Sequence, residues 1–208
     1  MSTRIVLATR NRHKLDELHR ILDAAGLDIE LLGADAFPDL PEIAETEASF
    51  AGNALLKARE VSRLTGLPAV ADDSGLCVDA LNGMPGILSA RWSGRHGDDA
   101  ANLALVLDQL SDVPDGRRGG AFRCAAAIAL PDGDERVVEG FIDGVIIREP
   151  RGSGGFGYDP IFVPIGGAET LAEIPAAQKD AISHRGRALR SLAPVIADLL
   201  DGRSTLLS

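Results

Sequence analysis

Four groups of residues in this chain contain the side chains best suited to chemistry. The first is a polar turn that follows a strand-like apolar run and precedes a helical pattern. A strand that leads into a helix directs backbone N–H groups and the positive end of the helix dipole to one point, which favours a phosphate group. The alternative is an ordinary helix start with solvated charges. The candidate phosphate ligands are Thr9, Arg10, Asn11, Arg12, His13 and Lys14.

The second group is the acidic segment Asp72-Asp73-Ser74-Gly75, which follows a predicted buried strand at 67–71. Adjacent carboxylates at a strand end repel each other unless a cation lies between them, and carboxylate oxygens are ligands that Mg²⁺ prefers. One carboxylate could also accept a proton from an attacking water molecule. The alternative is a simple acidic turn, since Asp, Ser and Gly are common turn residues.

The third group is the glycine-rich segment 152–160, which contains a literal GxGxxG pattern. A dinucleotide-binding fingerprint follows the first strand and opens a helix. Here the pattern lies late in the chain, and Pro160 prevents a helix. We therefore predict a loop whose backbone approaches a ligand, with Phe156 as a flat surface on which a base stacks for roughly 1–3 kcal/mol. The alternative is a tight turn with a core phenylalanine.

The fourth group, Lys179, His184 and Arg185, lies at the predicted start of the last helix. Cations at a helix N-terminus oppose the dipole, and an anion or an acceptor-rich ligand would remove the conflict. The alternative is exposed cations. Of 21 basic residues only three are lysines, Lys14, Lys57 and Lys179, and two of them fall inside these groups. A flexible ammonium group suits a mobile phosphate, although the distribution could also arise by chance.

Composition limits the classes of protein to consider. The 208 residues suffice for one domain or one domain split into two lobes. A formal charge of −10 disfavours binding to nucleic acid or to an anionic membrane. The two cysteines, Cys77 and Cys124, show no metal-ligand spacing, so we expect a reducing compartment. No apolar run approaches the ~18 residues of a membrane span, and the N-terminal residues lack a signal-peptide pattern, so we expect a cytoplasmic protein.

The elements that must position these groups begin with a strand at 4–8, a helix at 14–25 and a second strand at 28–32. This order is typical of an α/β sheet, in which ligands bind beyond the carboxyl ends of the strands. Ser49 is placed to cap a helix that runs to about residue 65. The segments 121–130 and 136–148 resemble strands of an antiparallel second lobe. Ser183 is placed to cap a final helix interrupted by Pro194.

Taken together, the four groups resemble the inosine triphosphate pyrophosphatase family, which hydrolyses noncanonical purine nucleoside triphosphates. Each motif alone is weak, but the ordered set covers nearly the whole chain and is highly specific. The matching segments are Leu7-Ala-Thr-Arg-Asn-Arg-His-Lys14, Asn53-Ala-Leu-Leu-Lys-Ala58, Ala71-Asp-Asp-Ser-Gly-Leu76, Pro85-Gly-Ile-Leu-Ser-Ala-Arg91, Gly154-Gly-Phe-Gly-Tyr-Asp-Pro-Ile-Phe162 and Lys179 through Arg185.

The resemblance implies an α/β fold with two lobes around a central mixed sheet, a long active-site cleft and an antiparallel second lobe. It implies a single domain over residues 1–208, a homodimer, Mg²⁺ as cofactor, and cleavage of ITP, dITP and XTP to the monophosphate and pyrophosphate. Asp73 looks like the general base and a metal ligand. The expected substrate contacts are the turn 9–14, Ser74, then Phe156, Gly157, Tyr158 and Asp159 for the nucleoside, and Lys179, His184 and Arg185 for the purine edge.

One position departs from the family pattern. The family's metal-binding glutamate precedes a Thr-Phe-x-Glu-Asn-Ala pattern, which here reads Ser49-Phe-Ala-Gly-Asn-Ala54, so one glutamate has become Gly52. Spacing favours Glu45 as the metal ligand, with Glu42 and Glu47 as alternatives.

Two other functions are compatible with the same residues. A non-catalytic nucleotide sensor would bind nucleotide without metal-dependent hydrolysis, and the Asp72-Asp73 pair argues against it. A Mg²⁺ phosphatase acting on small phosphate esters would need neither stacking on Phe156 nor a group that reads the purine edge.

Overall fold

A computed structural model describes residues 3–204, without the side chains of His13 and of residues 201–204. The strands are β1 (Thr3–Leu7), β2 (Ile29–Gly33), β3 (Ala69–Val78), β4 (Gly119–Ala129), β5 (Glu135–Ile146) and β6 (Phe162–Pro164). The α-helices are α1 (Arg12–Ala24), α2 (Phe50–Thr65), α3 (Asp99–Gln109), α4 (Ala176–Ile182) and α5 (His184–Ser204). In this described part of the chain, no helix is both long enough and apolar enough to cross a membrane.

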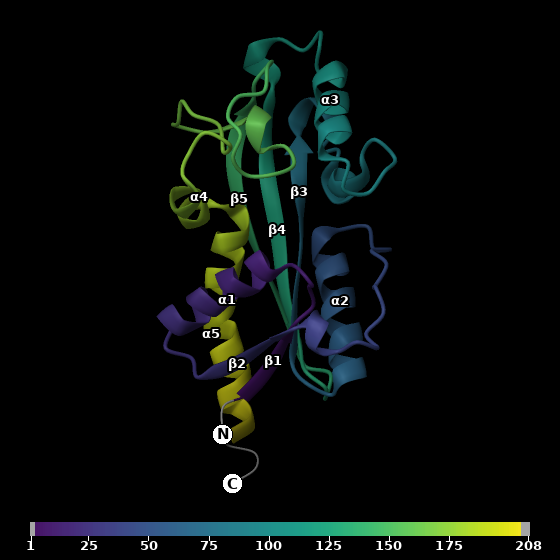
Figure 1. The fold of residues 1–208 in the computed structure, drawn as a ribbon, viewed down its shortest axis with the longest axis vertical. Helices are drawn as coiled ribbons and strands as arrows, with labels where there is room; N and C mark the ends of the chain where they lie inside the picture. Colours follow the sequence, from purple (N-terminus) through teal and green to yellow (C-terminus); the bar gives the residue numbers. More distant parts are fainter. Residues whose placement is uncertain (1–2, 205–208) are drawn as a thin grey trace. The chain divides into compact units, whose positions relative to one another are not determined.

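The six strands form one mixed sheet in the order β2-β1-β3-β4-β5-β6. Figure 1 shows the ribbon with the strands β1 to β5 labelled. Strand β1 pairs in parallel with both β2 and β3, whereas β5 pairs antiparallel with β6. The connection 130–134 between the neighbouring strands β4 and β5 is too short for a parallel crossover, so these strands form an antiparallel hairpin. The α/β class and the mixed sheet expected from the sequence are confirmed.

The chain divides into two compact units. Unit 1 contains the residues up to Asp73, the segment Ala125–Gly140 and the residues from Gly186 onward. Unit 2 contains Ser74–Cys124 and Phe141–Arg185. Two lobes were expected from the sequence; the single domain over residues 1–208 and the long cleft stay predictions.

In unit 1, α2 packs on the sheet through small residues. Its Ala54 and Ala58 are wholly buried against Ala71 of β3 and against alternate alanines of β4, which permits a close approach of helix and sheet. The hydroxyl of Ser49 accepts a hydrogen bond from the backbone N–H of Gly52 at 3.0 Å, so the cap predicted for this helix is confirmed. The helix therefore has a fixed start next to the acidic loop that precedes it.

Unit 2 has its own apolar core, in which buried residues of β3, α3, β4, β5 and the segment 158–162 pack together. Three elements differ from the prediction. Strand β3 continues to Val78, because Leu76 and Val78 are buried in this core and the N–H of Leu76 donates to the hydroxyl of Ser89. Lys179 belongs to a separate helix, α4, rather than to the start of the last helix. Pro194 lies inside α5 without interrupting it.

Candidate functional site

The acidic pair Asp72 and Asp73 lies in the middle of β3, so its prediction as a strand end is wrong. Successive residues of a strand point to opposite faces of the sheet, and the two carboxylates accordingly contact different partners. Both residues are buried, with exposed fractions of 6% and 7%. Asp72 contacts Lys14 and Asp73 contacts Asn53, so the surroundings of each carboxylate are described separately.

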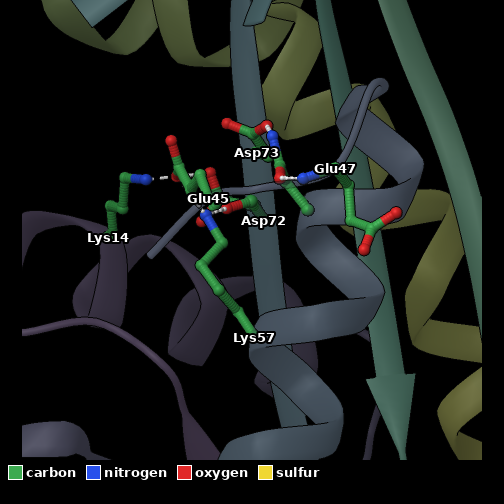
Figure 2. A network of polar contacts seen from close by, with 7 residues as sticks. Lys14, Glu45, Glu47, Lys57, Asp72 and Asp73 are labelled. Carbon is green, nitrogen blue, oxygen red and sulfur yellow. Dashed lines mark hydrogen bonds and ion pairs between the residues drawn. The ribbon is translucent and has the colours of Figure 1, made fainter. Parts of the chain in front are cut away.

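Asp73 shares its face of β3 with Ala71, the face that α2 covers. Its Oδ2 accepts a hydrogen bond of 2.9 Å from Nδ2 of Asn53, a wholly buried residue in the first turn of α2. The Oδ1 of Asn53 accepts a hydrogen bond of 3.0 Å from the backbone N–H of Glu47. The predicted general base is therefore linked through one amide to the acidic loop (Figure 2).

Lys57 lies one turn after Asn53 on α2 and binds the same loop. Its Nζ lies 2.8 Å from Oε1 of Glu45 and 2.7 Å from the backbone carbonyl oxygen of Asp72. Glu45, the predicted metal ligand, is thereby held at the part of β3 that contains the aspartates, as Figure 2 shows. Its alternatives Glu42 and Glu47 are exposed.

On the opposite face of β3, Asp72 forms an ion pair with Lys14, with Nζ 2.9 Å from Oδ2. The turn before Lys14 is organised by short contacts: the N–H of Asn11 donates to the hydroxyl of Thr9, and Arg10 donates to the carbonyl oxygen of Leu40. A pocket of about 300 Å³ adjoins this turn. Its lining includes Thr9, Arg10, Asn11, Arg12, Gly33 and Asp35.

The donors in unit 1 fit a magnesium ion chemically. In residues 3–204, no three His, Cys, Asp or Glu side chains converge as a ready-made metal cluster. Mg²⁺ does not need such a cluster, because it is commonly held by one or two carboxylates together with substrate phosphates and water. Asp73 and Glu45 supply hard oxygen donors of this kind. Lys57, which carries the positive charge beside Glu45, would have to share that carboxylate with the ion.

The glycine-rich loop of unit 2 is organised by Asp159, which is buried. Its Oδ2 accepts hydrogen bonds from the backbone N–H of Phe156 at 2.8 Å and from Nζ of Lys179 at 2.5 Å. The Phe156 side chain is 63% exposed, and Nζ of Lys179 lies 4.7 Å from the centre of its ring. The structure thus presents the predicted flat aromatic surface, with a cation directly beside it.

Other predicted contacts of unit 2 are used within the fold. The N–H of Gly157 donates to Oδ2 of Asp99 at 2.9 Å. The hydroxyl of the buried Tyr158 donates to the carbonyl oxygen of Ser89, and burial raises the pKa of this phenol, with a smaller contribution from Asp99. The ring of His184 stacks on Phe122, with centroids 5.0 Å apart.

The predicted site residues are divided between the two units, and the acidic segment itself is split between Asp73 and Ser74. The turn 9–14, Glu45 and Asp73 belong to unit 1, and Phe156–Asp159, Lys179, His184 and Arg185 belong to unit 2, as does the half-buried Ser74. The side chain of His13 lies outside the described residues. That the two sets act on one substrate stays a prediction.

Asn53 and Lys57 of the unit 1 cluster lie within a segment that matches the family pattern, but neither residue was predicted to have a role in the site. Their spacing of four positions places them on one face of α2, which is the signal that could have identified them. The rarity of lysine was a second signal. Each of the three lysines forms an ion pair with an acidic residue: Lys14 with Asp72, Lys57 with Glu45, and Lys179 with Asp159.

The chain is similar to known proteins over nearly its whole length. The model of the Ham1 family matches residues 5–195. A protein named dITP/XTP pyrophosphatase from Streptomyces avermitilis is 61% identical over 198 residues, which are 95% of this chain and 99% of the relative. The crystal structure of a nucleoside-triphosphatase / dITP/XTP pyrophosphatase from Mycobacterium abscessus has a TM-score of 0.80 and 59% sequence identity. The match covers 93% of this chain and 100% of the Mycobacterium chain. The structure of a HAM1 protein from Coxiella burnetii has a TM-score of 0.87 and 41% sequence identity. The match covers 94% of this chain and 99% of the Coxiella chain. The chain belongs to the Ham1 family.

Proposed function

We propose that this chain is a Mg²⁺-dependent pyrophosphohydrolase of noncanonical purine nucleoside triphosphates. It would convert dITP, XTP and ITP with one water molecule to the nucleoside monophosphate and pyrophosphate. The observation that supports this proposal most directly is the buried Asp73, held by Asn53, in a chain 61% identical to a named dITP/XTP pyrophosphatase.

In this proposal Asp73 accepts the proton of the attacking water. One of its oxygens is fixed by Asn53, so the carboxylate plane is oriented before substrate arrives, as positioning of a general base requires. Lys14 would bind the polyphosphate by exchanging its partner Asp72 for phosphate oxygens, whereas Lys57 would keep its contact with Glu45 and share that carboxylate with the ion. The turn 9–14 would hold the terminal phosphates through its backbone N–H groups.

Asp73 and Glu45 would hold the magnesium ion. The ion would supply positive charge to the polyphosphate and so stabilise the charge that develops as the bond between the α and β phosphates breaks. The proposal therefore predicts loss of turnover on chelation. It also predicts that Glu45→Gln requires a higher Mg²⁺ concentration for half-maximal activity, whereas an unchanged requirement would remove Glu45 from the metal site.

Selectivity would come from the purine edge. Hypoxanthine and xanthine carry a 6-oxo acceptor, whereas adenine carries a 6-amino donor. A donor from His184 or Arg185 would pair with the oxo group and be left without an acceptor against adenine. A buried donor without an acceptor costs about 1–3 kcal/mol, which corresponds to about a 5- to 150-fold preference in kcat/KM.

The test compares dITP, ITP, XTP, ATP and GTP as substrates of the purified chain, with Mg²⁺ and with excess EDTA. We expect a preference for the first three over ATP and no turnover in EDTA. Equal rates across all bases would favour a phosphatase of broad specificity, and tight binding without turnover would favour a nucleotide sensor.

The homodimer expected from the resemblance would have twice the chain mass of 21.8 kDa in light scattering.

A further inference from the structure

Asn53 connects two parts of the unit 1 cluster that are distant in sequence. Its side chain is wholly buried in the first turn of α2 and makes two hydrogen bonds. The backbone N–H of Glu47 donates to Oδ1, and Nδ2 donates to Oδ2 of Asp73. A backbone N–H is only a donor, so it selects the oxygen end of the amide and leaves the NH₂ end for Asp73. The orientation of the amide is therefore determined by its two partners.

This orientation matters because the carboxylate is buried. A buried charge is costly unless hydrogen bonds compensate for it, and a hydrogen bond to a carboxylate also fixes the direction of its second oxygen. The same amide holds the loop at Glu47, two residues after Glu45, and Glu45 is tied to α2 by Lys57. One helical face thus places the aspartate and the acidic loop relative to each other.

We propose that Asn53 is a positioning residue for hydrolysis: it holds the Asp73 carboxylate and the segment Glu45–Glu47 in one fixed arrangement. The inference rests on the proposed function, in which Asp73 is the general base. Asn53 is not a catalytic residue in this account, since it acts through Asp73. A displacement of about 1 Å of a catalytic group can reduce turnover about 100-fold, so the effect should appear in kcat rather than in KM.

A matched control distinguishes positioning from simple structural support. Asn102 of α3 is also buried, with 1% exposed, and its Oδ1 also accepts a hydrogen bond from a backbone N–H, that of Ser93. Its Nδ2 has no hydrogen-bond partner among the described residues. Asn102 therefore reproduces the backbone contact of Asn53 without the contact to a carboxylate. Asn102→Ala should lower the melting temperature and leave kcat within about twofold of the wild type, because no reacting group depends on it.

The experiment measures kcat and KM for dITP with saturating Mg²⁺, and the melting temperature, for the wild type, Asn53→Ala, Asn53→Asp and Asn102→Ala. Asn53→Ala removes both hydrogen bonds. Asn53→Asp keeps an acceptor for Glu47 at nearly the same volume but replaces the neutral amide donor with a second carboxylate, which repels Asp73 or shares a proton with it. We expect kcat to fall about 10- to 100-fold in both Asn53 variants, with KM within about threefold of the wild type.

The inference is overturned if Asn53→Asp, folded at the assay temperature, keeps wild-type kcat, because the amide donor to Asp73 would then be dispensable. It is also overturned if Asn53→Ala and Asn102→Ala lose kcat equally. Should Asn53→Ala not fold, Asn53→Asp decides alone. Failure of both to fold while Asn102→Ala folds would overturn the positioning role in favour of a purely structural one. A wild type without dITP turnover contradicts the proposed function, whereas an active wild type with unaffected Asn53 variants contradicts only this inference.

Discussion

The ammonium group of Lys14, in the first turn of α1, lies 2.9 Å from the carboxylate of Asp72 on β3. The Asp72 side chain is only 5% exposed, whereas that of Lys14 is 24% exposed. A cation that the sequence predicts to bind phosphate therefore neutralises a buried carboxylate in the structure. A polyphosphate would have to compete with Asp72 for this lysine.

Lys14→Met should therefore reduce both stability and substrate affinity. Removing one partner of a buried ion pair leaves an uncompensated charge, and the partial exposure of Lys14 reduces the expected loss to about 1–3 kcal/mol in the free energy of unfolding. The double variant Lys14→Met/Asp72→Asn should recover most of the stability and keep the raised KM for dITP. Urea unfolding and initial-rate kinetics measure the two quantities. A double variant no more stable than Lys14→Met would show that the ion pair does not compensate the charge of Asp72.

Arg118 should stabilise unit 2 without affecting turnover. Its buried guanidinium donates to the carbonyl oxygens of Ile146, Leu110 and Ile147, and burial lowers its pKa. Arg118→Met removes all three of these hydrogen bonds, although the Leu110 carbonyl oxygen still accepts one from the N–H of Val113 at 3.0 Å. The loss should cost about 3 kcal/mol in the free energy of unfolding. Arg118→Lys should recover only part, since one ammonium group cannot reach three separate carbonyls in the geometry of a guanidinium. Chemical denaturation measures the loss in the free energy of unfolding. A fully folded Arg118→Met variant with a reduced kcat would contradict a purely structural role.

The ion pair between Arg59 and Glu135 should make a small, pH-dependent contribution to stability. Two hydrogen bonds from Arg59 lower the pKa of Glu135. A carboxylate whose pKa is lower in the folded state stabilises the protein at pH values above its unfolded-state pKa, which is about 4.3 for glutamate. This contribution disappears as the pH falls through the folded-state pKa.

Because the side chains are 54% and 31% exposed, Glu135→Gln should cost less than about 1 kcal/mol at pH 7. The difference from the wild type should be smaller at pH 3, which lies below the unfolded pKa of about 4.3. Thermal unfolding at both pH values and at two salt concentrations checks this expectation. A difference that persists undiminished at low pH would mean that the glutamine disturbs packing rather than charge.

The sequence predicts elements well where the local pattern decides the structure. Ser49 is visible in the sequence as the cap of α2, and the structure confirms it. The end of β3 could not be predicted, because Asp, Ser and Gly favour turns locally. The segment is held as a strand by the burial of Leu76 and by the contact of its N–H with Ser89, thirteen residues later.

For the candidate site, the sequence identifies the residue types but not their partners. The predicted turn, Asp73 and the aromatic loop all follow from local motifs. That Asn53 binds Asp73 and that Lys57 binds Glu45 depends on how α2 lies on β3, which no local pattern contains. The rarity of lysine pointed to three positions, and the structure adds that each of them neutralises an acidic partner.

The most direct test of the central claim follows dITP hydrolysis by ³¹P NMR for the wild type and Asp73→Asn. The wild type should release dIMP and pyrophosphate. Asp73→Asn should fold, because an amide oxygen can still accept the hydrogen bond from Asn53, and should lose at least about 100-fold in kcat, as expected for removal of a general base. Release of orthophosphate by the wild type, or a folded Asp73→Asn with near wild-type turnover, would contradict the account.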